Sequence, residues 1–210
     1  MIITLQDVGR RYNREWIFRR LSYTFSAGKK YAILGPNGAG KSTLIKVLTG
    51  SLSVSEGNLT YETFAQKQVA VDAVYNHITI AAPYMELIEE FTLSELIDFH
   101  FQHKKYLDGF NKESLLSLSY LEDARDKEVK HFSSGMKQRL KLVLACCAQS
   151  DIVFLDEPTS NLDAKGESWY QELIDQTIDA SRILVVGSNQ PKEYAFCDEQ
   201  VDIQQYKHFK

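Results

Sequence analysis

A glycine-rich stretch at residues 35–43 has the spacing G-x-x-x-x-G-K-[ST], which is typical of a loop that binds phosphate groups. Glycine lets the backbone bend around a phosphate without a Cβ in the way, and successive N–H groups then point inward. Lys41 can reach the β- and γ-phosphates of a nucleotide, and the Ser42 hydroxyl can ligate Mg²⁺. The residues that we expect to hold a nucleoside triphosphate are Gly35, Asn37, Gly38, Ala39, Gly40, Lys41, Ser42 and Thr43.

Two adjacent acids, Asp156 and Glu157, follow the apolar run of residues 152–155. Such a run predicts a buried strand of a parallel sheet, and ligands bind at the carboxyl ends of such strands. We expect Asp156 to hold Mg²⁺, directly or through water, and Glu157 to orient or deprotonate an attacking water. The alternative is that one of the two acids is simply solvated, because neighbouring residues on a strand point to opposite faces.

The elements around the phosphate-binding loop support its assignment. A strand is predicted at residues 31–34 and a helix at 43–48, which Gly50 can cap. The bare motif should occur by chance in roughly one chain of this size in a hundred, and this context weakens the alternative of an ordinary glycine turn. Strands at 1–8, 21–25 and 57–61, with a turn at 7–13, predict a small antiparallel sheet attached to the core.

The stretch between residues 84 and 150 is predicted to be mostly helical. A capping box at residues 92–95 opens one helix, a second begins near Asn111, and Ser133 or Ser134 caps a third. Residues 160–163 then turn into a further helix, and the remaining strands of the core are predicted at 77–82, 183–186 and 201–203.

The composition is that of an ordinary globular chain of one domain, with 210 residues, 44% hydrophobic and 25% charged. The net charge of −4 does not favour a nucleic-acid partner. Cys146, Cys147 and Cys197 have the spacing of neither a disulfide framework nor a metal site, so reduced thiols are expected. The sequence has neither a bilayer-length apolar run nor a signal-peptide pattern, so any transport channel is expected on another chain.

The order of these motifs resembles that of the ATP-binding subunit of ABC (ATP-binding cassette) transporters, over nearly the whole chain. Residues 35–43 match the family's Walker A loop, and residues 152–158 match Walker B with its catalytic glutamate, Glu157. Residues 132–136 stand in for the signature sequence, and residues 160–163 for the D-loop, which ends in Asp163. Tyr12 lies where the family has an aromatic residue that stacks on adenine.

The resemblance implies a fold and an arrangement of subunits. The fold is α/β: a P-loop NTPase with a RecA-like parallel-sheet core, a small N-terminal antiparallel β subdomain and an inserted helical subdomain. One domain is expected at 1–210, with the core and β subdomain at about 1–83 and 151–210 and the helical part at about 84–150. Two cassettes, as a homodimer or a pair, sandwich ATP and Mg²⁺ head to tail, and Ser133, Ser134 and Gly135 of one contact the nucleotide of the other.

Two positions depart from the family's pattern. The family usually has a Gln after the strand that here ends at Ala82, where it touches Mg²⁺ and the attacking water; Ala82 or Pro83 occupies that place, and Glu86 is the nearest polar candidate. The family's switch histidine is replaced by Asn189, whose amide can donate a hydrogen bond to a phosphate oxygen but cannot shuttle a proton. We therefore expect hydrolysis through Glu157 that is slow in the isolated chain.

The leading functional prediction is an ATPase that energises transport of an unknown substrate through a separate integral-membrane permease. The chain would lie in the cytoplasm, on the inner face of the membrane, and the apolar residues 84–91 would contact the permease unless they pack in the core. The first alternative is a non-catalytic nucleotide sensor that dimerises on ATP. The second is a soluble, non-transport ABC ATPase that acts on nucleic acid or ribosomes, which the acidic charge does not favour.

Overall fold

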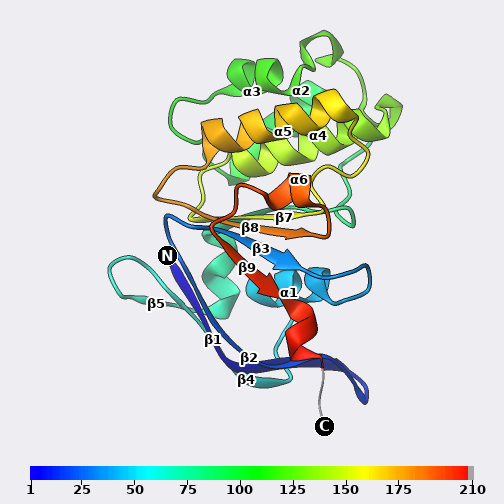
Figure 1. The fold of residues 1–210 in the computed structure, drawn as a ribbon. Helices are drawn as coiled ribbons and strands as arrows, with labels where there is room; N and C mark the ends of the chain where they lie inside the picture. The colour runs from blue at the N-terminus through cyan, green and yellow to red at the C-terminus, as the bar shows by residue number, and fades with distance from the viewer. Residues whose placement is uncertain (208–210) are drawn as a thin grey trace.

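A five-stranded parallel sheet separates a helical half of the molecule from a half that is built on an antiparallel sheet (Figure 1). The computed structural model describes residues 1–207, so the last three residues of the predicted domain lie outside it. The strands of the parallel sheet, in spatial order, are β6 (Ile78–Ala81), β7 (Ile152–Asp156), β8 (Ile183–Ser188), β3 (Lys30–Leu34) and β9 (Glu199–Asp202). Every neighbouring pair is parallel, so the carboxyl ends of these strands lie at one edge. The predicted α/β fold is confirmed.

Neighbouring residues of β7 divide between two hydrophobic cores that cover opposite faces of the parallel sheet. Val153 and Leu155 pack with the helical half, whereas Ile152 and Phe154 pack with the antiparallel sheet and with α1 (Lys41–Leu48). All four side chains are buried. A strand that is covered on both faces has no exposed position, which explains the uninterrupted apolar run in the sequence.

The helical half consists of α2 (Leu93–His103), α3 (Lys112–Ser119), α4 (Ser134–Cys146) and α5 (Ala164–Thr177). Each begins where the sequence predicts, because a side chain caps its first turn; the capping residues are Thr92, Asn111, Ser133 and Asp163. The single-turn 3₁₀ helices η2 (Glu122–Ala124) and η3 (Val129–His131) connect α3 to α4.

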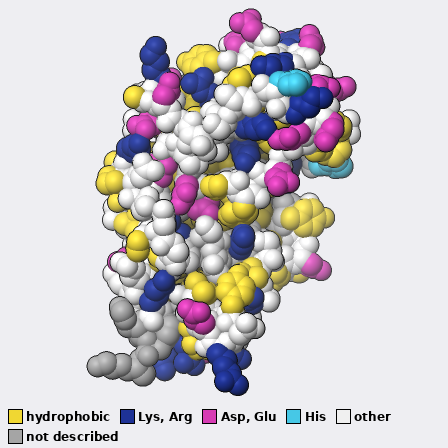
Figure 2. Space-filling view, turned by 90° about the vertical axis from the view of Figure 1, so that its right-hand side faces the viewer, with side chains coloured by type: hydrophobic (Ala, Val, Ile, Leu, Met, Phe, Trp, Pro, Cys, Tyr) yellow, Lys and Arg dark blue, Asp and Glu magenta, His cyan; other side chains and the backbone are white. Residues whose placement is uncertain are grey.

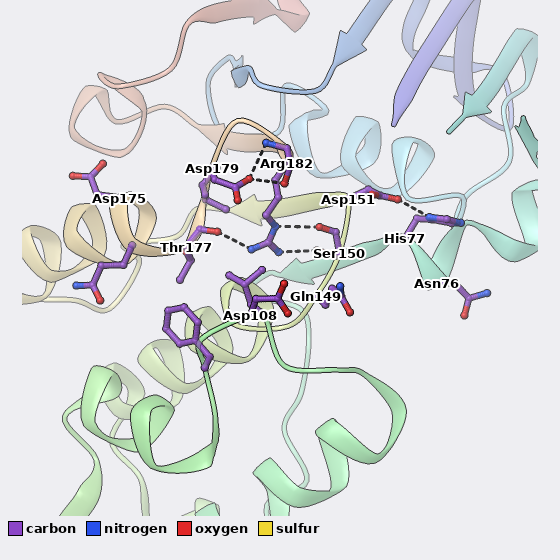
Figure 3. Close-up of a pocket in the computed structure, with 15 residues that line it drawn as sticks. Asn76, His77, Asp108, Gln149, Ser150, Asp151, Asp175, Thr177, Asp179 and Arg182 are labelled. Carbon is purple, nitrogen blue, oxygen red and sulfur yellow. Dashed lines mark hydrogen bonds and ion pairs between the residues drawn. The ribbon is translucent and has the colours of Figure 1, made fainter. Parts of the chain in front are cut away.

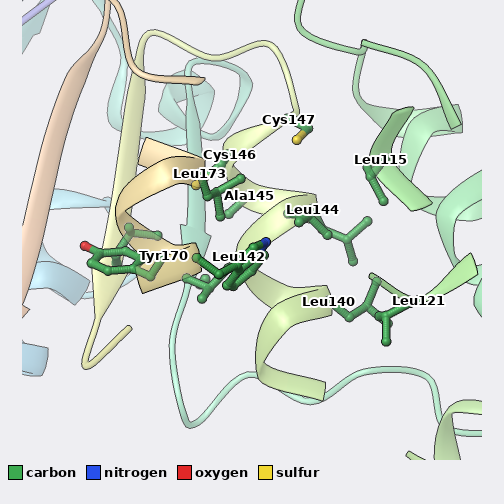
Figure 4. Packing of buried hydrophobic residues seen from close by; sticks show 14 of the residues in the cluster. Leu115, Leu121, Leu140, Leu142, Leu144, Ala145, Cys146, Cys147, Tyr170 and Leu173 are labelled. Carbon is green, nitrogen blue, oxygen red and sulfur yellow. The ribbon is translucent and has the colours of Figure 1, made fainter. Parts of the chain in front are cut away.

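Helix α4 lies in the middle of the core of the helical half (Figure 4). Leu140 and Leu144 point towards Leu115 and Leu121, while Leu142 points towards Tyr170 of α5. The buried leucines of α4 therefore pack against neighbouring elements on two sides of the helix.

The antiparallel sheet has the order β2-β1-β4-β5 and confirms the small sheet predicted for the N-terminal region. Its strands are β1 (Ile2–Tyr12), β2 (Glu15–Ser26), β4 (Glu56–Glu62) and β5 (Gln68–Val69). The short elements η1 (Val71–Asn76), α6 (Pro191–Tyr194) and η4 (Ile203–Tyr206) complete the described chain. On the side of the molecule that Figure 2 shows, acidic and basic side chains of the described residues lie intermixed over the helical half.

The turn predicted at residues 7–13 is wrong, because β1 continues through it to Tyr12, which pairs with Glu15. The pairing register shifts after Leu5, where Asp7 takes a left-handed φ of 50° and donates its N–H to the Ser22 hydroxyl at 2.9 Å. Such a bulge absorbs residues that break the alternation without ending the strand.

The three cysteines are free thiols in the structure, as the sequence predicts. Cys146 and Cys147 are buried at the end of α4, and Cys197 is half-buried. Burial raises the pKa of the Cys146 thiol to about 11, so this thiol stays protonated near neutral pH and packs as a small apolar group.

The buried guanidinium of Arg182, just before β8, joins the carboxyl ends of α4 and α5. Figure 3 shows its contacts with Thr177 and Ser150. The guanidinium donates to the carbonyl oxygens of Cys146 at 2.8 Å, Ala148 at 3.0 Å and Thr177 at 2.9 Å. It also donates to the carbonyl oxygen and hydroxyl of Ser150, at 3.1 and 2.7 Å. The carboxyl end of a helix leaves carbonyl groups unpaired and carries partial negative charge. One buried cation therefore satisfies the ends of both helices.

We expect Arg182→Ala to lower the free energy of unfolding by about 3 kcal/mol, because it leaves several buried carbonyl groups without a donor. Arg182→Lys should recover only part of the loss, since an ammonium cannot reach acceptors on both helices. Arg14→Ala, on the exposed hairpin turn, is the control and should change stability by less than about 0.5 kcal/mol. Urea unfolding measures all three, and equal stabilities for Arg182→Ala and Arg14→Ala would show that this network is not stabilising.

Candidate nucleotide-binding site

Three neighbouring strands bring the predicted site residues to one edge of the parallel sheet. In the order β7-β8-β3, β7 ends at Asp156, β8 ends just before Asn189, and β3 ends just before Gly35. Because these strands are parallel and adjacent, the acids, the replacement for the switch histidine and the phosphate-binding loop meet there. The sequence predicts the tips of these strands, but not that β8 lies between the other two.

The phosphate-binding loop closes around the side chain of Lys41. Its ammonium donates to the carbonyl oxygens of Gly35 at 3.0 Å and Pro36 at 3.4 Å, and the residue is only 4% exposed. Gly40 caps α1 with a φ of 106°, and a Cβ there would lie 2.5 Å from Cγ2 of Ile17, so only glycine fits. The ammonium is thus held inside the loop, where a phosphate group would meet it.

Asp156 is buried to 1% exposure, and neither carboxylate oxygen has a hydrogen-bond partner within residues 1–207. Gly187 of β8 leaves the necessary room, because a Cβ there would lie 2.8 Å from Oδ1 of Asp156. Burial raises the pKa of the Asp156 carboxyl above its ordinary value, and the nearby Ser42 hydroxyl partly offsets this rise. A buried carboxylate that lacks a partner beside a hydroxyl fits a divalent cation such as Mg²⁺.

The protein offers few ligands of its own to such a cation. In the part of the chain that the structure describes, no three His, Cys, Asp or Glu residues gather closely enough to hold a metal ion. Mg²⁺ commonly takes one or two protein oxygens and completes its shell with phosphate oxygens and water. Ser42 and Asp156 therefore suit a metal that arrives with the nucleotide.

The backbone at Glu157 takes a left-handed φ of 48°, which is uncommon for a residue other than glycine and costs energy. Its N–H donates to the carbonyl oxygen of Gly187 at 2.8 Å, so the turn out of β7 stays fastened to β8. The half-buried carboxylate of Glu157 follows directly on Asp156 at the strand tip. A strained backbone that is held in this way is typical of positions where function depends on geometry.

Glu193 of α6 ties the loop after Glu157 to the end of β8, a role that no sequence pattern signals. Its Oε1 accepts the N–H and the hydroxyl of Thr159, at 2.8 and 2.6 Å, and its Oε2 accepts the hydroxyl of Ser188. Glu193 is fully buried, yet both of its oxygens are paired. The contact therefore holds the segment before Asn189 against the segment after the two acids.

Asn189 contacts the tip of the phosphate-binding loop. Its amide Nδ2 donates to Oδ1 of Asn37 at 3.1 Å, and both residues are exposed. Sequence reasoning missed Lys207, whose ammonium donates to the carbonyl oxygen of Gly38 at 3.3 Å. Tyr12 lies at the end of β1 with 45% of its surface exposed and the guanidinium of Arg10 at 4.8 Å from its ring.

The signature residues lie on the surface of the helical half rather than against the phosphate-binding loop. Ser133 caps α4 and accepts the N–H of Met136 at 3.2 Å, and Ser134 beside it is also exposed. Together with Gly135 and Asp163 they line a surface hollow of about 390 Å³. No hydrogen bond joins residues 133–135 to residues 35–43 within the described chain.

Glu86, the polar candidate for the missing Gln, is exposed and lies near the ammonium of Lys141, which it influences electrostatically. Ala82 is buried, and Pro83 carries no polar side-chain group. The residue of this loop that approaches α1 is instead Tyr84, whose ring lies 4.0 Å from the ammonium of Lys46. No sequence pattern singles out Tyr84, because the contact joins segments that are far apart in the chain.

A phosphate-binding loop after β3, with an acid at the tip of β7 two strands away in the same sheet, defines the chain as a phosphate-loop nucleoside triphosphatase. The sequence profile of the family described as "ABC transporter" matches residues 18–160. This match covers more than half of the chain, which therefore belongs to the ABC transporter family. Within it the chain is an ATP-binding subunit and an ABC-type ATPase.

Several relatives support this assignment over different shares of their length. The ABC transporter ATP-binding protein YybJ of Bacillus subtilis is 26% identical over 94% of this chain and 90% of its own. The lantibiotic transport ATP-binding protein SrtF of Streptococcus pyogenes is 28% identical over 90% of this chain and 80% of its own length. The Nod factor export ATP-binding protein I of Rhizobium johnstonii is 34% identical over 77% of this chain, which spans only 52% of that protein.

Solved structures agree on the fold. An ABC transporter ATP-binding protein of Pyrococcus furiosus superposes with a TM-score of 0.81 at 19% identity, covering 99% of this chain and 100% of its own. A dimeric bacterial ABC transporter cassette superposes with a TM-score of 0.79 at 19% identity, covering 96% and 94%. Within residues 1–207, no helix has both the length and the apolar composition needed to cross a membrane.

Asp156→Asn should raise the free energy of unfolding of the chain without nucleotide or metal by on the order of 1 kcal/mol near neutral pH, because it removes a buried charge. The sign follows from proton linkage. Burial raises the pKa of Asp156, so above the ordinary pKa the folded chain binds more protons than the unfolded chain. The stability lost by burying the Asp156 carboxylate therefore grows as the pH rises from the ordinary pKa through the raised pKa of the folded chain.

Urea unfolding of parent and variant at pH 5 and pH 7.5 measures this effect, and the gain should be at least as large at pH 7.5. The control is Asp175→Asn, an exposed acid on α5, which should change stability by less than about 0.5 kcal/mol at either pH. An Asp156→Asn variant that is less stable than the parent at pH 7.5 would mean that the carboxylate has a partner that stabilises it.

Proposed function

We propose that two copies of this chain, or this chain and a second cassette, bind Mg²⁺-ATP head to tail and hydrolyse it to drive transport through a separate permease. The observation that carries the proposal is the division of the motifs within one chain. The phosphate-binding loop and the acids share one sheet edge, whereas exposed Ser133 and half-buried Gly135 line a surface hollow on the helical half. A second copy could place its exposed signature helix against the nucleotide, where the helix N-terminus would favour the phosphate charge.

We assign roles to the chain's own residues from their geometry and, for Tyr12, from the family resemblance alone. Lys41 and the N–H groups at the start of α1 would hold the phosphates, and Tyr12 would stack on the adenine. Ser42 and Asp156 would hold Mg²⁺, which offsets the negative charge of the phosphates when bound. Glu157 would accept a proton from the attacking water, and Asn189 would donate a hydrogen bond to a phosphate oxygen.

Hydrolysis by the isolated chain is expected to be slow, because an asparagine amide at position 189 cannot accept and return a proton. The same observation keeps a second function open, namely a nucleotide sensor whose output is ATP-driven dimerisation. Glu157 distinguishes the two, since a sensor has no use for a base held in a strained backbone at the strand tip.

Glu157→Gln should reduce steady-state Mg²⁺-ATP hydrolysis by at least about 100-fold, because an amide cannot accept the proton from water. The variant should also form a dimer in ATP that persists during size-exclusion chromatography, whereas the parent should return to monomer as it turns over. A variant that hydrolyses ATP as fast as the parent would refute the role of Glu157. A parent that dimerises on ATP without hydrolysing it would favour the sensor.

We further propose that the permease contacts an apolar groove formed by β6, residues 84–91 and α2, which encloses about 460 Å³. Met85, Ile88 and Phe99 line the groove and are 38%, 37% and 42% exposed. Leu87 and Phe91 of the same segment instead pack against the helical core. Residues 84–91 therefore include side chains that pack in the core and side chains that are free to contact a permease. Exposed large apolar side chains around a groove suit an apolar helix of a partner.

Several polar side chains also line the groove, among them His100, His103, Lys104 and Lys141. Nε2 of His100 is buried and has no hydrogen-bond partner among the described residues, and burial lowers the pKa of this histidine. A neutral imidazole nitrogen without a proton accepts a hydrogen bond. We therefore expect the permease segment in the groove to be mainly apolar, with polar groups facing the charged side chains of the lining. Attachment there would hold the chain on the inner face of the membrane.

Ile88→Glu should abolish co-purification with a multi-span membrane protein encoded beside this chain's gene, because it places a charge in the apolar contact. The matched control is Phe64→Glu, at an equally apolar but 62% exposed position between β4 and β5. ATP binding by both variants should stay within about twofold of the parent, since neither residue lies at the nucleotide edge. Loss of co-purification in the control alone would place the contact on the antiparallel sheet.

A further inference from the structure

The loop after β6 lies beside the predicted metal site, because β6 pairs with β7 and Ala81 lies opposite Leu155, next to Asp156. The loop is fastened at its start. The N–H of Met85 donates to the carbonyl oxygen of Ala82 at 3.1 Å. The ammonium of Lys141 lies 3.5 Å from that oxygen and 3.4 Å from that of Pro83. Tyr84 is thus the central side chain of an anchored turn.

The ring of Tyr84 packs against the helix that carries the predicted metal ligand. The ammonium of Lys46 lies 4.0 Å from the centre of the ring, a cation–π contact. Ser42 and Lys46 are one turn apart on α1, so their side chains emerge on the same face of the helix. Tyr84 therefore lies along the face that presents the Ser42 hydroxyl.

The phenol also lies within the electrostatic reach of Asp156. Tyr84 keeps 42% of its surface exposed, but partial desolvation of its phenol raises its pKa well above the ordinary value, and the negative charge of Asp156 raises it further. The hydroxyl consequently stays protonated at any physiological pH. It can donate and accept a hydrogen bond, but it cannot act as a base.

We propose that Tyr84 is a positioning residue of the ATPase site, whose hydroxyl hydrogen-bonds water at the metal and γ-phosphate, where Ala82 and Pro83 have no polar side chain to offer. This inference rests on the proposed function, because it assumes that ATP and a divalent cation occupy this edge of the sheet. Tyr84 orients the water, and Glu157 accepts its proton. The cation–π contact with Lys46 keeps the ring in place without using the hydroxyl.

Tyr84→Phe isolates the hydroxyl, because the ring over Lys46 remains and only the O–H is removed. We expect kcat for ATP to fall about tenfold with KM within twofold, and the unfolding midpoint in urea to stay unchanged. Tyr84→Gln, which restores an amide in this loop, should recover part of the rate. The control is Tyr120→Phe, a 60% exposed tyrosine whose ring lies 5.8 Å from the guanidinium of Arg139, and it should match the parent.

A second readout does not depend on turnover. The affinity for Mn²⁺ in the presence of a non-hydrolysable ATP analogue, measured by electron paramagnetic resonance, should fall three- to fivefold in Tyr84→Phe and stay unchanged in Tyr120→Phe. Equal kcat and equal Mn²⁺ affinity for parent and Tyr84→Phe would overturn the proposal. A parent that binds Mn²⁺ with the analogue but does not hydrolyse ATP would overturn the proposed function alone, and the Mn²⁺ comparison would still decide the role of Tyr84.

Discussion

The buried carboxylate of Asp156 is the constraint on which the arrangement of the site depends. A charge that is almost fully buried without a hydrogen-bond partner costs stability, so the structure around it has to provide a reason for its presence. Gly187 leaves room for the oxygens, and α1 brings the Ser42 hydroxyl beside them. These features fit a cation that is bound together with a nucleotide, and they explain why the apolar run of β7 ends in an acid.

Hydrogen bonds of buried polar side chains connect this site to the rest of the molecule. Glu193 joins the loop after the acids to the end of β8, and Arg182 joins two helix ends to the start of the same strand. Gln138 of α4 donates to the carbonyl oxygen of Pro158 at 2.7 Å. The signature helix is thereby attached to the segment that follows Glu157, which gives a physical route by which events at the nucleotide could reach the helical half.

The chain presents its functional groups on separate surfaces. The nucleotide edge, the hollow beside Ser133 and the apolar groove beside Ile88 are formed by different elements. The hollow exposes polar groups and the groove exposes apolar groups, and neither set has a use within one chain. That division is what a subunit needs if it works between a second cassette and a membrane partner. Tyr84 lies where the groove segment meets the nucleotide edge, so its loop belongs to both surfaces.

The sequence by itself determined the features that depend on neighbouring residues. Glycine spacing defines the phosphate-binding loop, an apolar run ending in two acids defines β7, and the capping residues Thr92 and Ser133 define the starts of their helices. Only the tertiary structure decided the strand order, the passage of β1 through the expected turn, and the contacts of Arg182, Glu193 and Tyr84. Each of these depends on contacts between segments far apart in the chain, and such contacts leave no periodic trace in the sequence that a local pattern could reveal.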